Sequence, residues 1–299
     1  MNRTFASWID GNPGAAVFLT GLLGLLPLFG LGFAFFLPGA VPALVVLMRS
    51  PRDGVLVAAG ASVLLALAMW MLGRPIPVGL IYSLWVLGPP LALGMLLRRS
   101  GSLVLCLQVA VLAGVVMVVL LHAALGDPER FWAPFVRDLA QEMQRRGLPM
   151  DLEEEGLVET LARTLWGWVT VLTVLLAMCA LFLARWWQTR PQQAGRFGAE
   201  FQQLRLGVVL GAAAAIAIAA SLLSDRPLVD DVARLFMGAL MVVGLAAAHR
   251  FKAEGRLNGL WLWGIYVLLV LAAPVMVAAL AGWGFVDNWL RSQRAAQSA

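Results

Sequence analysis

The stretch Gly126-Asp127-Pro128-Glu129-Arg130-Phe131-Trp132 opens the only long polar interruption in this chain, which continues to Thr164. Residues 126–164 hold nine of the seventeen acidic residues but only five of the twenty-two basic ones. Loops poor in arginine and lysine are easily translocated, whereas cytoplasmic loops keep an excess of them. We therefore expect residues 126–164 to form an extracytoplasmic loop, and every other loop then takes its side in turn.

The composition is that of a polytopic membrane protein. Of the 299 residues, 61% are hydrophobic and 13% are charged, against roughly 25% charged in soluble domains, and the mean hydropathy is +0.84. We attribute the net charge of +5 to inside-facing loops and not to nucleic-acid binding, because no basic cluster lies on a soluble module. Cys106 and Cys179 lie in apolar runs without metal-ligand spacing, so we expect no disulfide, metal or other cofactor.

Two uncharged runs are too long for one untilted span. Residues 15–48 have 34 positions without a charge and residues 257–286 have 30, which at about 1.5 Å per residue exceeds a hydrocarbon core of about 30 Å. Glycine and proline punctuate both runs. The first run is expected to break at Gly30–Gly32 or at Pro38-Gly39, and the second at Pro274 or at Gly282–Gly284.

The remaining apolar runs have the length of single spans and end in short loops that often carry arginine. They cover residues 54–72, 76–97, 103–121, 166–187, 207–223 and 232–248, with residues 224–231 as a short acidic outer loop. Ten passes follow, with eight or nine as alternatives, and fourteen basic residues then fall inside and eight outside. We expect one all-α integral membrane domain over residues 1–299, in the bilayer of the bacterial cytoplasmic (inner) membrane, with the C-terminus inside.

The outer loop itself predicts two amphipathic helices. Asp127 can cap the first, and its apolar residues fall four apart: Phe131, Phe135, Leu139 and Met143. Asp151 and Glu154 have capping-box spacing, and the second helix should run through Leu157 and Leu161 into the next span. The apolar stripe of the first helix could lie on the membrane surface, cover a cavity as a lid, or dock a partner.

Three further local features carry predictions. The inside segment of residues 188–205 is long enough for a short amphipathic helix that uses Phe197, Phe201 and Leu204. Gly211 belongs to an edge of small residues and should sit at a close helix contact. Asp287 and Arg291 are four apart on one helix and should form a modest ion pair.

The carboxyl-terminal half resembles a known family. The order and spacing of four runs carry the likeness: Phe197-Gly198-Ala199-Glu200-Phe201-Gln202-Gln203-Leu204-Arg205-Leu206-Gly207, Gly244-Leu245-Ala246 through His249, Leu257-Asn258-Gly259-Leu260-Trp261, and Gly284-Phe285-Val286-Asp287-Asn288-Trp289-Leu290-Arg291. They resemble the YybS-like family of bacterial membrane proteins, a domain of unknown function. That resemblance implies a distant likeness to the S-components of energy-coupling-factor transporters, which bind a small molecule from outside. Gly207 stands where the family usually has proline. The resemblance therefore does not predict how the helix after Gly207 begins.

The sequence offers little chemistry within the membrane. Apart from chain-end positions such as Asp287, no acidic or basic residue is placed deep in an apolar run, and no nucleotide-binding or hydrolase motif occurs. We therefore expect a protein that is not an enzyme. His122, at a helix end, is read as an interface residue and not as a metal ligand, because the one other histidine, His249, lies on the opposite side of the predicted topology.

Two functions from different classes stay open. The first is a membrane-embedded substrate-binding subunit for small-molecule uptake, energised by a partner such as an ATPase module, with a ligand pocket formed by Trp70, Tyr82, Ser83, Trp85 and Gln108. The alternative is a scaffold or assembly subunit of a bacterial membrane protein complex, with partner-docking residues Phe131, Phe135, Leu139, Glu200, Phe201 and Arg205. A third reading, a membrane enzyme acting on a lipid-borne substrate, would use His122 or Glu153–Glu155 at the surface.

Overall fold

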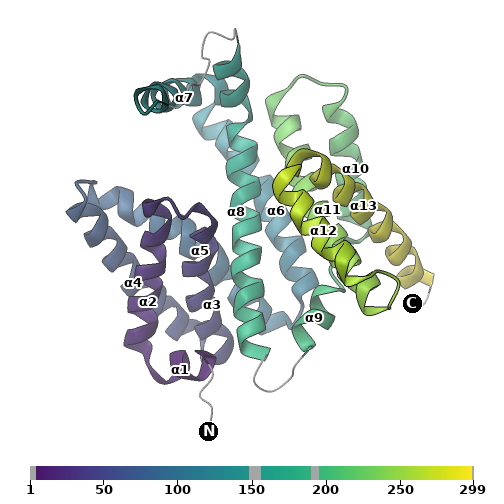
Figure 1. Ribbon diagram of the computed structural model, residues 1–299, viewed down its shortest axis with the longest axis horizontal. Coiled ribbons are helices and arrows are strands. Elements are labelled where there is room, and N and C mark those ends of the chain that lie inside the picture. The colour runs from purple at the N-terminus through teal and green to yellow at the C-terminus, as the bar shows by residue number, and fades with distance from the viewer. Residues whose placement is uncertain (1–4, 148–155, 190–194, 298–299) are drawn as a thin grey trace. The chain divides into compact units, whose positions relative to one another are not determined.

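The computed structural model describes residues 5–147, 156–189 and 195–297, and every regular element in these ranges is a helix (Figure 1). The chain divides into two compact units. Unit 1 comprises Met1–Ala110 and Thr173–Leu204, and unit 2 comprises Val111–Leu172 and Arg205–Ala299. Two long helices, α6 (Leu103–Leu125) and α8 (Leu157–Thr189), contribute residues to both units.

Unit 1 is built from short helices at the start of the chain followed by long ones. Besides its parts of α6 and α8, it contains α1 (Phe5–Gly11), α2 (Pro13–Leu25), the 3-10 turns η1 (Leu26–Phe29) and η2 (Gly32–Phe36), α3 (Leu37–Met48), α4 (Pro51–Met71), α5 (Ile76–Ser100) and α9 (Arg196–Phe201). Gly30 has a φ of 86°, which glycine adopts without strain, and it separates α2 from α3. The predicted break at Gly30–Gly32 is therefore confirmed, and the alternative at Pro38-Gly39 is wrong because both residues lie in α3.

A proline pair interrupts the hydrogen bonding of α5. Pro89 and Pro90 have no N–H group, so the carbonyls of Trp85 and Val86 lack their usual helical donor. Helix α3 lies against this place with Gly39, where a Cβ would come within 2.5 Å of the Pro90 ring and 3.0 Å of the Val86 carbonyl oxygen. Only a residue without a side chain lets α3 cover the open part of α5 so closely.

Unit 2 contains the second broken run. Besides its parts of α6 and α8, it contains α7 (Pro128–Arg145), α10 (Gly207–Ser221), α11 (Pro227–Ala253), α12 (Gly259–Leu271) and α13 (Ala273–Gln297). Ala272 leaves the helical conformation just before Pro274, so the break predicted there is confirmed. The alternative at Gly282–Gly284 is wrong, because α13 continues through it.

Helices α11 and α13 cross at two glycines. A Cβ added to Gly244 would lie 2.0 Å from the Leu280 carbonyl oxygen, and one added to Gly284 would lie 2.1 Å from that of Leu240. The two backbones are therefore in direct contact, the arrangement that small residues permit between membrane helices. Gly211 on α10 is also at a close contact, as predicted, since its Cβ would lie 2.5 Å from the Asn288 amide nitrogen.

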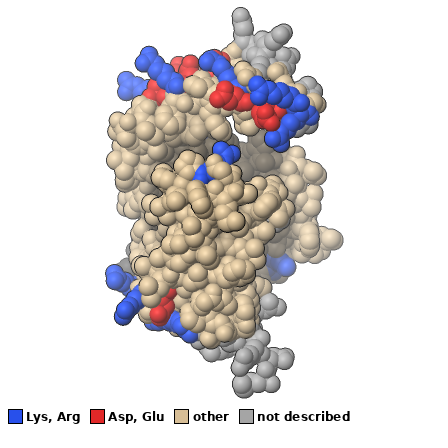
Figure 2. Space-filling model, turned by 90° about the vertical axis from the view of Figure 1, so that its left-hand side faces the viewer, with Lys and Arg blue, Asp and Glu red and all other residues tan. Residues whose placement is uncertain are grey.

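The helices have the lengths and surfaces of a membrane protein. Five of the described helices are long and apolar enough to cross a bilayer: α4, α5, α6, α8 and α11. Their outward faces expose large apolar side chains, such as Ile81 and Leu84 on α5, instead of polar ones. Figure 2 shows broad stretches of surface without charged side chains. The chain is a helical membrane protein.

The start of α11 corrects one prediction. Residues 224–231 were expected to form an outer loop, but α11 begins at Pro227, and Asp231 lies one turn inside the helix. Proline at the first helical position is common because its missing N–H has no helical partner there. Asp231 is therefore a buried acid within an apolar helix, contrary to the expectation that no such residue exists.

We expect Gly284→Ala to lower the stability of the protein and Gly282→Ala to leave it unchanged. The first change drives a methyl group into the Leu240 carbonyl, an overpacking that costs about 1–3 kcal/mol. Gly282 has nothing within 4 Å of an added Cβ. Thermal unfolding of both variants in detergent, followed by circular dichroism, measures the difference. Equal melting temperatures would contradict the close crossing of α11 and α13.

Candidate functional site

Two of the five predicted ligand-pocket residues meet in unit 1. The rings of Tyr82 and Trp85 on α5 both face Phe35 edge to face, with centroids 6.4 and 5.8 Å away. The Tyr82 hydroxyl donates to the Gly24 carbonyl at 2.8 Å, and the Trp85 indole N–H donates to Thr173 Oγ1 of α8 at 2.7 Å. These bonds tie α2, α5 and α8 together around the aromatic cluster.

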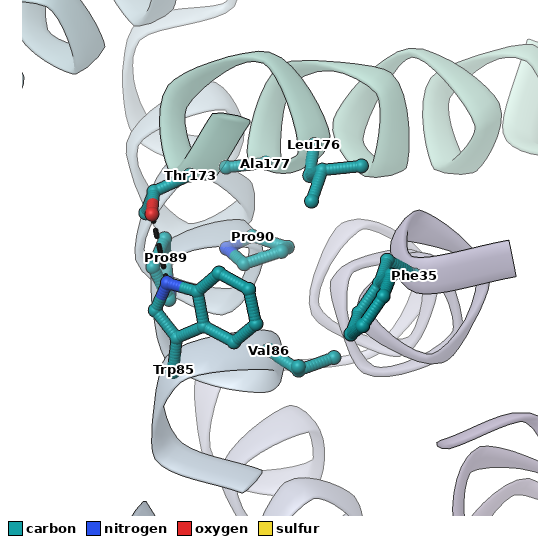
Figure 3. Close-up of a pocket in the computed structure, with 8 residues that line it drawn as sticks. All are labelled: Phe35, Trp85, Val86, Pro89, Pro90, Thr173, Leu176 and Ala177. Carbon is teal, nitrogen blue, oxygen red and sulfur yellow. Dashed lines mark hydrogen bonds between the residues drawn. The ribbon is translucent and has the colours of Figure 1, made fainter. Parts of the chain in front are cut away.

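A small cavity lies beside Trp85 (Figure 3). Trp85 and Phe35 stand on opposite sides of it, and the other lining residues are Val86, Pro89, Pro90, Thr173, Leu176 and Ala177. The space open to the centre of a water molecule is about 10 Å³, close to the minimum that one buried water requires. In this conformation the cavity has room for a water molecule and not for a metabolite.

The other three predicted pocket residues lie elsewhere. Trp70 is 59% exposed on the surface of α4. Ser83 is buried, but its hydroxyl donates to the Leu80 carbonyl of its own helix at 2.9 Å. Gln108 is half-buried on α6. None of the three lines the cavity beside Trp85.

Unit 2 holds a buried ionic cluster that the sequence did not reveal. Asp231 of α11 is fully buried, and its two oxygens are each bonded: Oδ2 lies 2.9 Å from His122 Nε2 of α6, and Oδ1 accepts from Arg234 Nη1 at 2.6 Å. We call these three residues the outer ionic cluster, after the side of the membrane on which the predicted topology would place them. His122 is thus an interface residue, as predicted, and lies between α6 and α11. Its partner, Asp231, belongs to the segment 224–231 that the sequence predicted to be a loop.

Helix α8 closes one side of the outer ionic cluster with a glycine. A Cβ on Gly167 would come within 2.3 Å of Asp231 Oδ1 and 2.5 Å of Arg234 Nη1, so no larger residue fits. The next residue, Trp168, lies with its ring 5.9 Å from the Arg234 guanidinium carbon, within the range of a cation–π contact. The side chains of His122 and Arg234 keep 14% and 23% of their surface exposed, so the cluster is reachable from outside the protein.

The predicted docking stripe on α7 is confirmed as a helix face, and it is exposed. Asp127 caps α7 by accepting from the Glu129 amide at 3.0 Å. Phe131, Phe135 and Leu139 are 45%, 55% and 47% exposed. The capping box at Asp151 and Glu154 and the acids Glu153–Glu155 lie outside the described residues, but α8 does run from Leu157 into the apolar span as predicted.

The other predicted docking residues contact their own chain. Glu200 on α9 accepts from Nη2 and Nε of Arg185 on α8, at 2.6 and 2.8 Å, and from Arg196 at 2.9 Å. Phe201 packs against Phe182 of α8 with ring centroids 5.3 Å apart. Arg205 belongs to unit 2 and is half-buried. The predicted short helix is confirmed, and its acid and two aromatic rings, those of Phe197 and Phe201, hold it to α8.

A second polar cluster lies where α11, α13 and α10 meet in unit 2. Asp287 is ion-paired with Arg291 at 3.9 Å, as predicted, but its main partner is Arg250 of α11, whose guanidinium donates to both carboxylate oxygens. Asn288 is fully buried; its side-chain oxygen accepts from the amides of Leu206 and Gly207 at 2.8 and 2.9 Å. Asn288 therefore satisfies two amides at the start of α10.

Among the described residues, no group of three or more His, Cys, Asp or Glu side chains converges in a way that could hold a metal ion. Comparisons of the chain with protein-family models, curated proteins and solved structures found no match. The outer ionic cluster is therefore the strongest candidate site on geometry alone, because it combines full burial of a carboxylate, a histidine and an arginine partner on its two oxygens and partial access.

We expect Thr173→Val to destabilise unit 1 more than Thr170→Val on the same helix. Thr173 is the acceptor for the Trp85 indole N–H, and an unsatisfied buried donor costs about 1–3 kcal/mol. The Thr170 hydroxyl only donates to the Trp166 carbonyl one turn back. Chemical or thermal unfolding in detergent measures both variants, and an equal loss would show that the bond to Trp85 contributes nothing specific.

We expect the contribution of Glu200 to stability to vanish in acid. Burial raises the pKa of its carboxyl, but the hydrogen bonds and charges of Arg185 and Arg196 outweigh this and leave the pKa below its ordinary value. The stabilisation is then complete above the unfolded-state pKa of about 4.3 and is lost as the pH falls through the lower folded-state pKa. Melting temperatures of the wild type and Glu200→Gln should differ most at neutral pH and converge in acid. Glu142→Gln, which removes an exposed pair with Arg146, serves as the control and should change little at any pH.

Proposed function

We propose that this protein is a membrane-embedded binding subunit for small-molecule uptake, energised by a partner, and that its ligand contacts the outer ionic cluster. The observation that carries the proposal is the full burial of Asp231 between His122 and Arg234. Ionisable side chains inside membrane spans are costly, and where they occur they commonly mark ligand or ion pathways. A purely structural contact between α6 and α11 would need only apolar packing.

The chemistry of the cluster suits a polar ligand. Arg234 uses one of its guanidinium donors on Asp231, and its planar fork has further N–H groups that can bind a carboxylate or phosphate. The indole of Trp168 beside the guanidinium offers an apolar surface for the rest of a ligand. A few polar groups among apolar and aromatic residues is the usual composition of a small-molecule site.

The proposed topology places this cluster at the outer side. His122 is near the end of α6, just before residues 126–164, and Asp231 follows the short connection from α10 to α11. The distribution of arginine supports residues 126–164 outside and the C-terminus inside, with eight to ten passes. The chain resembles the YybS-like family, which is distantly similar to transporter S-components. That resemblance supports a topology in which a ligand enters from outside and a partner protein supplies the energy.

We expect Arg234→Met to abolish ligand retention and Arg137→Met to leave it intact. Arg137 is also paired with an acid, Glu159 at 3.0 Å, but it lies on the surface of α7 and has no part in the cluster. Native mass spectrometry of protein extracted gently from its own membranes reports a retained small molecule directly. Retention by both variants, with unchanged melting temperatures, would rule out the cluster as the site.

The alternative function, a scaffold or assembly subunit, rests on the exposed stripe Phe131, Phe135 and Leu139 of α7. It predicts other membrane proteins at fixed stoichiometry in the same spectrum, with no ligand. A retained metabolite, or a bound ATPase with its coupling subunit, would favour the uptake function instead.

A further inference from the structure

We propose that α7 is an interfacial membrane helix, and that the bilayer itself covers its exposed apolar stripe. The stripe consists of Phe131, Phe135 and Leu139, which follow one another at intervals of four and so occupy one side of the helix. The proposal is independent of the proposed ligand site, because none of these residues belongs to the outer ionic cluster.

Helix α7 has two apolar sides, and only one of them is buried by the protein. Ala133, Val136 and Ala140 are buried, and the first two pack against Val158 and Ala162 of α8. The stripe is on the neighbouring side. Phe131, at its start, also touches Trp166 of α8, with ring centroids 4.8 Å apart, whereas Phe135 and Leu139 lie farther along α7. Three large apolar side chains at roughly half exposure next to one another would be unfavourable in water, since full burial of such a side chain is worth about 1.5–3 kcal/mol and roughly half of that remains to be gained at each.

The position of α7 along α8 places the stripe at the membrane boundary. In Figure 1, α7 lies crosswise to α8, as a helix in the plane of a bilayer lies across a span. An ion pair between Arg137 and Glu159 and a ring contact between Trp132 and Trp166, with centroids 4.9 Å apart, fix it to the first turns of α8. The apolar run of α8 begins at this level, and tryptophans concentrate at such interfaces.

The apolar surface of α8 continues from the level of this contact. Leu161 and Leu172 of α8 are exposed, and Leu172 lies in the candidate span, where a bilayer would surround it. The stripe and this surface belong to the same unit of the protein. A bilayer that covers Leu172 and the exposed Leu161 reaches the level at which α7 packs on α8, because Leu161 is next to Ala162.

The charged residues of α7 suit the headgroup region. They are Arg130, Arg137, Arg145 and Arg146 together with Glu129, Asp138 and Glu142, and Asp138 and Glu142 border the stripe, three residues after Phe135 and Leu139. Four positive and three negative charges leave a net charge of one, so attraction to anionic lipid contributes little and apolar insertion dominates. Unit 2 has an apolar groove lined by residues of α10 and α13, and another lined by residues of α6. The stripe of α7 lines neither groove, so a role of the stripe as a lid over them is not supported.

Site-specific fluorescence distinguishes lipid from water and from protein. Cys106 and Cys179 are replaced by alanine, and a single cysteine carrying the environment-sensitive probe NBD is placed at Leu139 in one protein and at Gln141 in another. Both positions are exposed on α7, but Leu139 belongs to the stripe and Gln141 to the polar side. The proteins are reconstituted into vesicles of phosphatidylcholine, with and without phosphatidylglycerol, and their melting temperatures are checked first.

The expected result is a blue-shifted emission at position 139 that is quenched by lipids with a nitroxide high on the acyl chain and is protected from iodide. The probe at position 141 should show the reverse, and added phosphatidylglycerol should change neither. Iodide access at both positions would overturn the proposal, because the stripe would then face water. Protection at position 139 without quenching by the lipid nitroxide would also overturn it, because protein would then cover the stripe as a lid or partner.

Discussion

The contact between the backbones of α11 and α13 is the constraint on which most of unit 2 depends. Gly244 and Gly284 let these helices touch, and the polar contacts further along both helices follow from that approach. Arg250 can reach Asp287 because each lies one to two turns beyond the crossing, and Asn288 can then reach the start of α10. In a bilayer there is no hydrophobic force between apolar helices, so close packing and such buried polar bonds hold the unit together.

The positions of breaks and caps could be predicted from the sequence because glycine, proline and aspartate act locally. Gly30 separates two helices through its positive φ, Pro274 begins a new one, and Asp127 caps α7 with its own side chain. Burial of Asp231 was missed for an equally local reason. Asp230-Asp231 follows a short polar segment and resembles a loop, although Pro227 marks the helix start four residues earlier. That proline was the signal that could have placed the acid inside the span.

The faces of the helices could not be predicted, because most of the spans are apolar on every side. Trp70 and Trp85 both stand in apolar runs, yet one is exposed and the other bonds Thr173 across a helix interface. Only the contacts between neighbours decide which tryptophan is inside. The same holds for the predicted ligand pocket, whose five residues come from three helices with no sequence signal for their relative rotation. In α7 the alternation of charged and apolar residues indicates which side of the helix is apolar, and Phe131, Phe135 and Leu139 do share one exposed side.

The proline pair of α5 bears on how the protein is made. An isolated membrane helix with unpaired carbonyls at Trp85 and Val86 would expose them to acyl chains, and each unsatisfied group costs several kcal/mol there. Helix α3 covers the Val86 carbonyl and keeps it from acyl chains, because Gly39 lets the two backbones approach, and α3 is synthesised before α5. The helix that packs over the proline pair, α3, is therefore made before α5. During biogenesis α5 would leave the insertion machinery against an α3 already in place, and the order of helices in the gene becomes part of how this unit assembles.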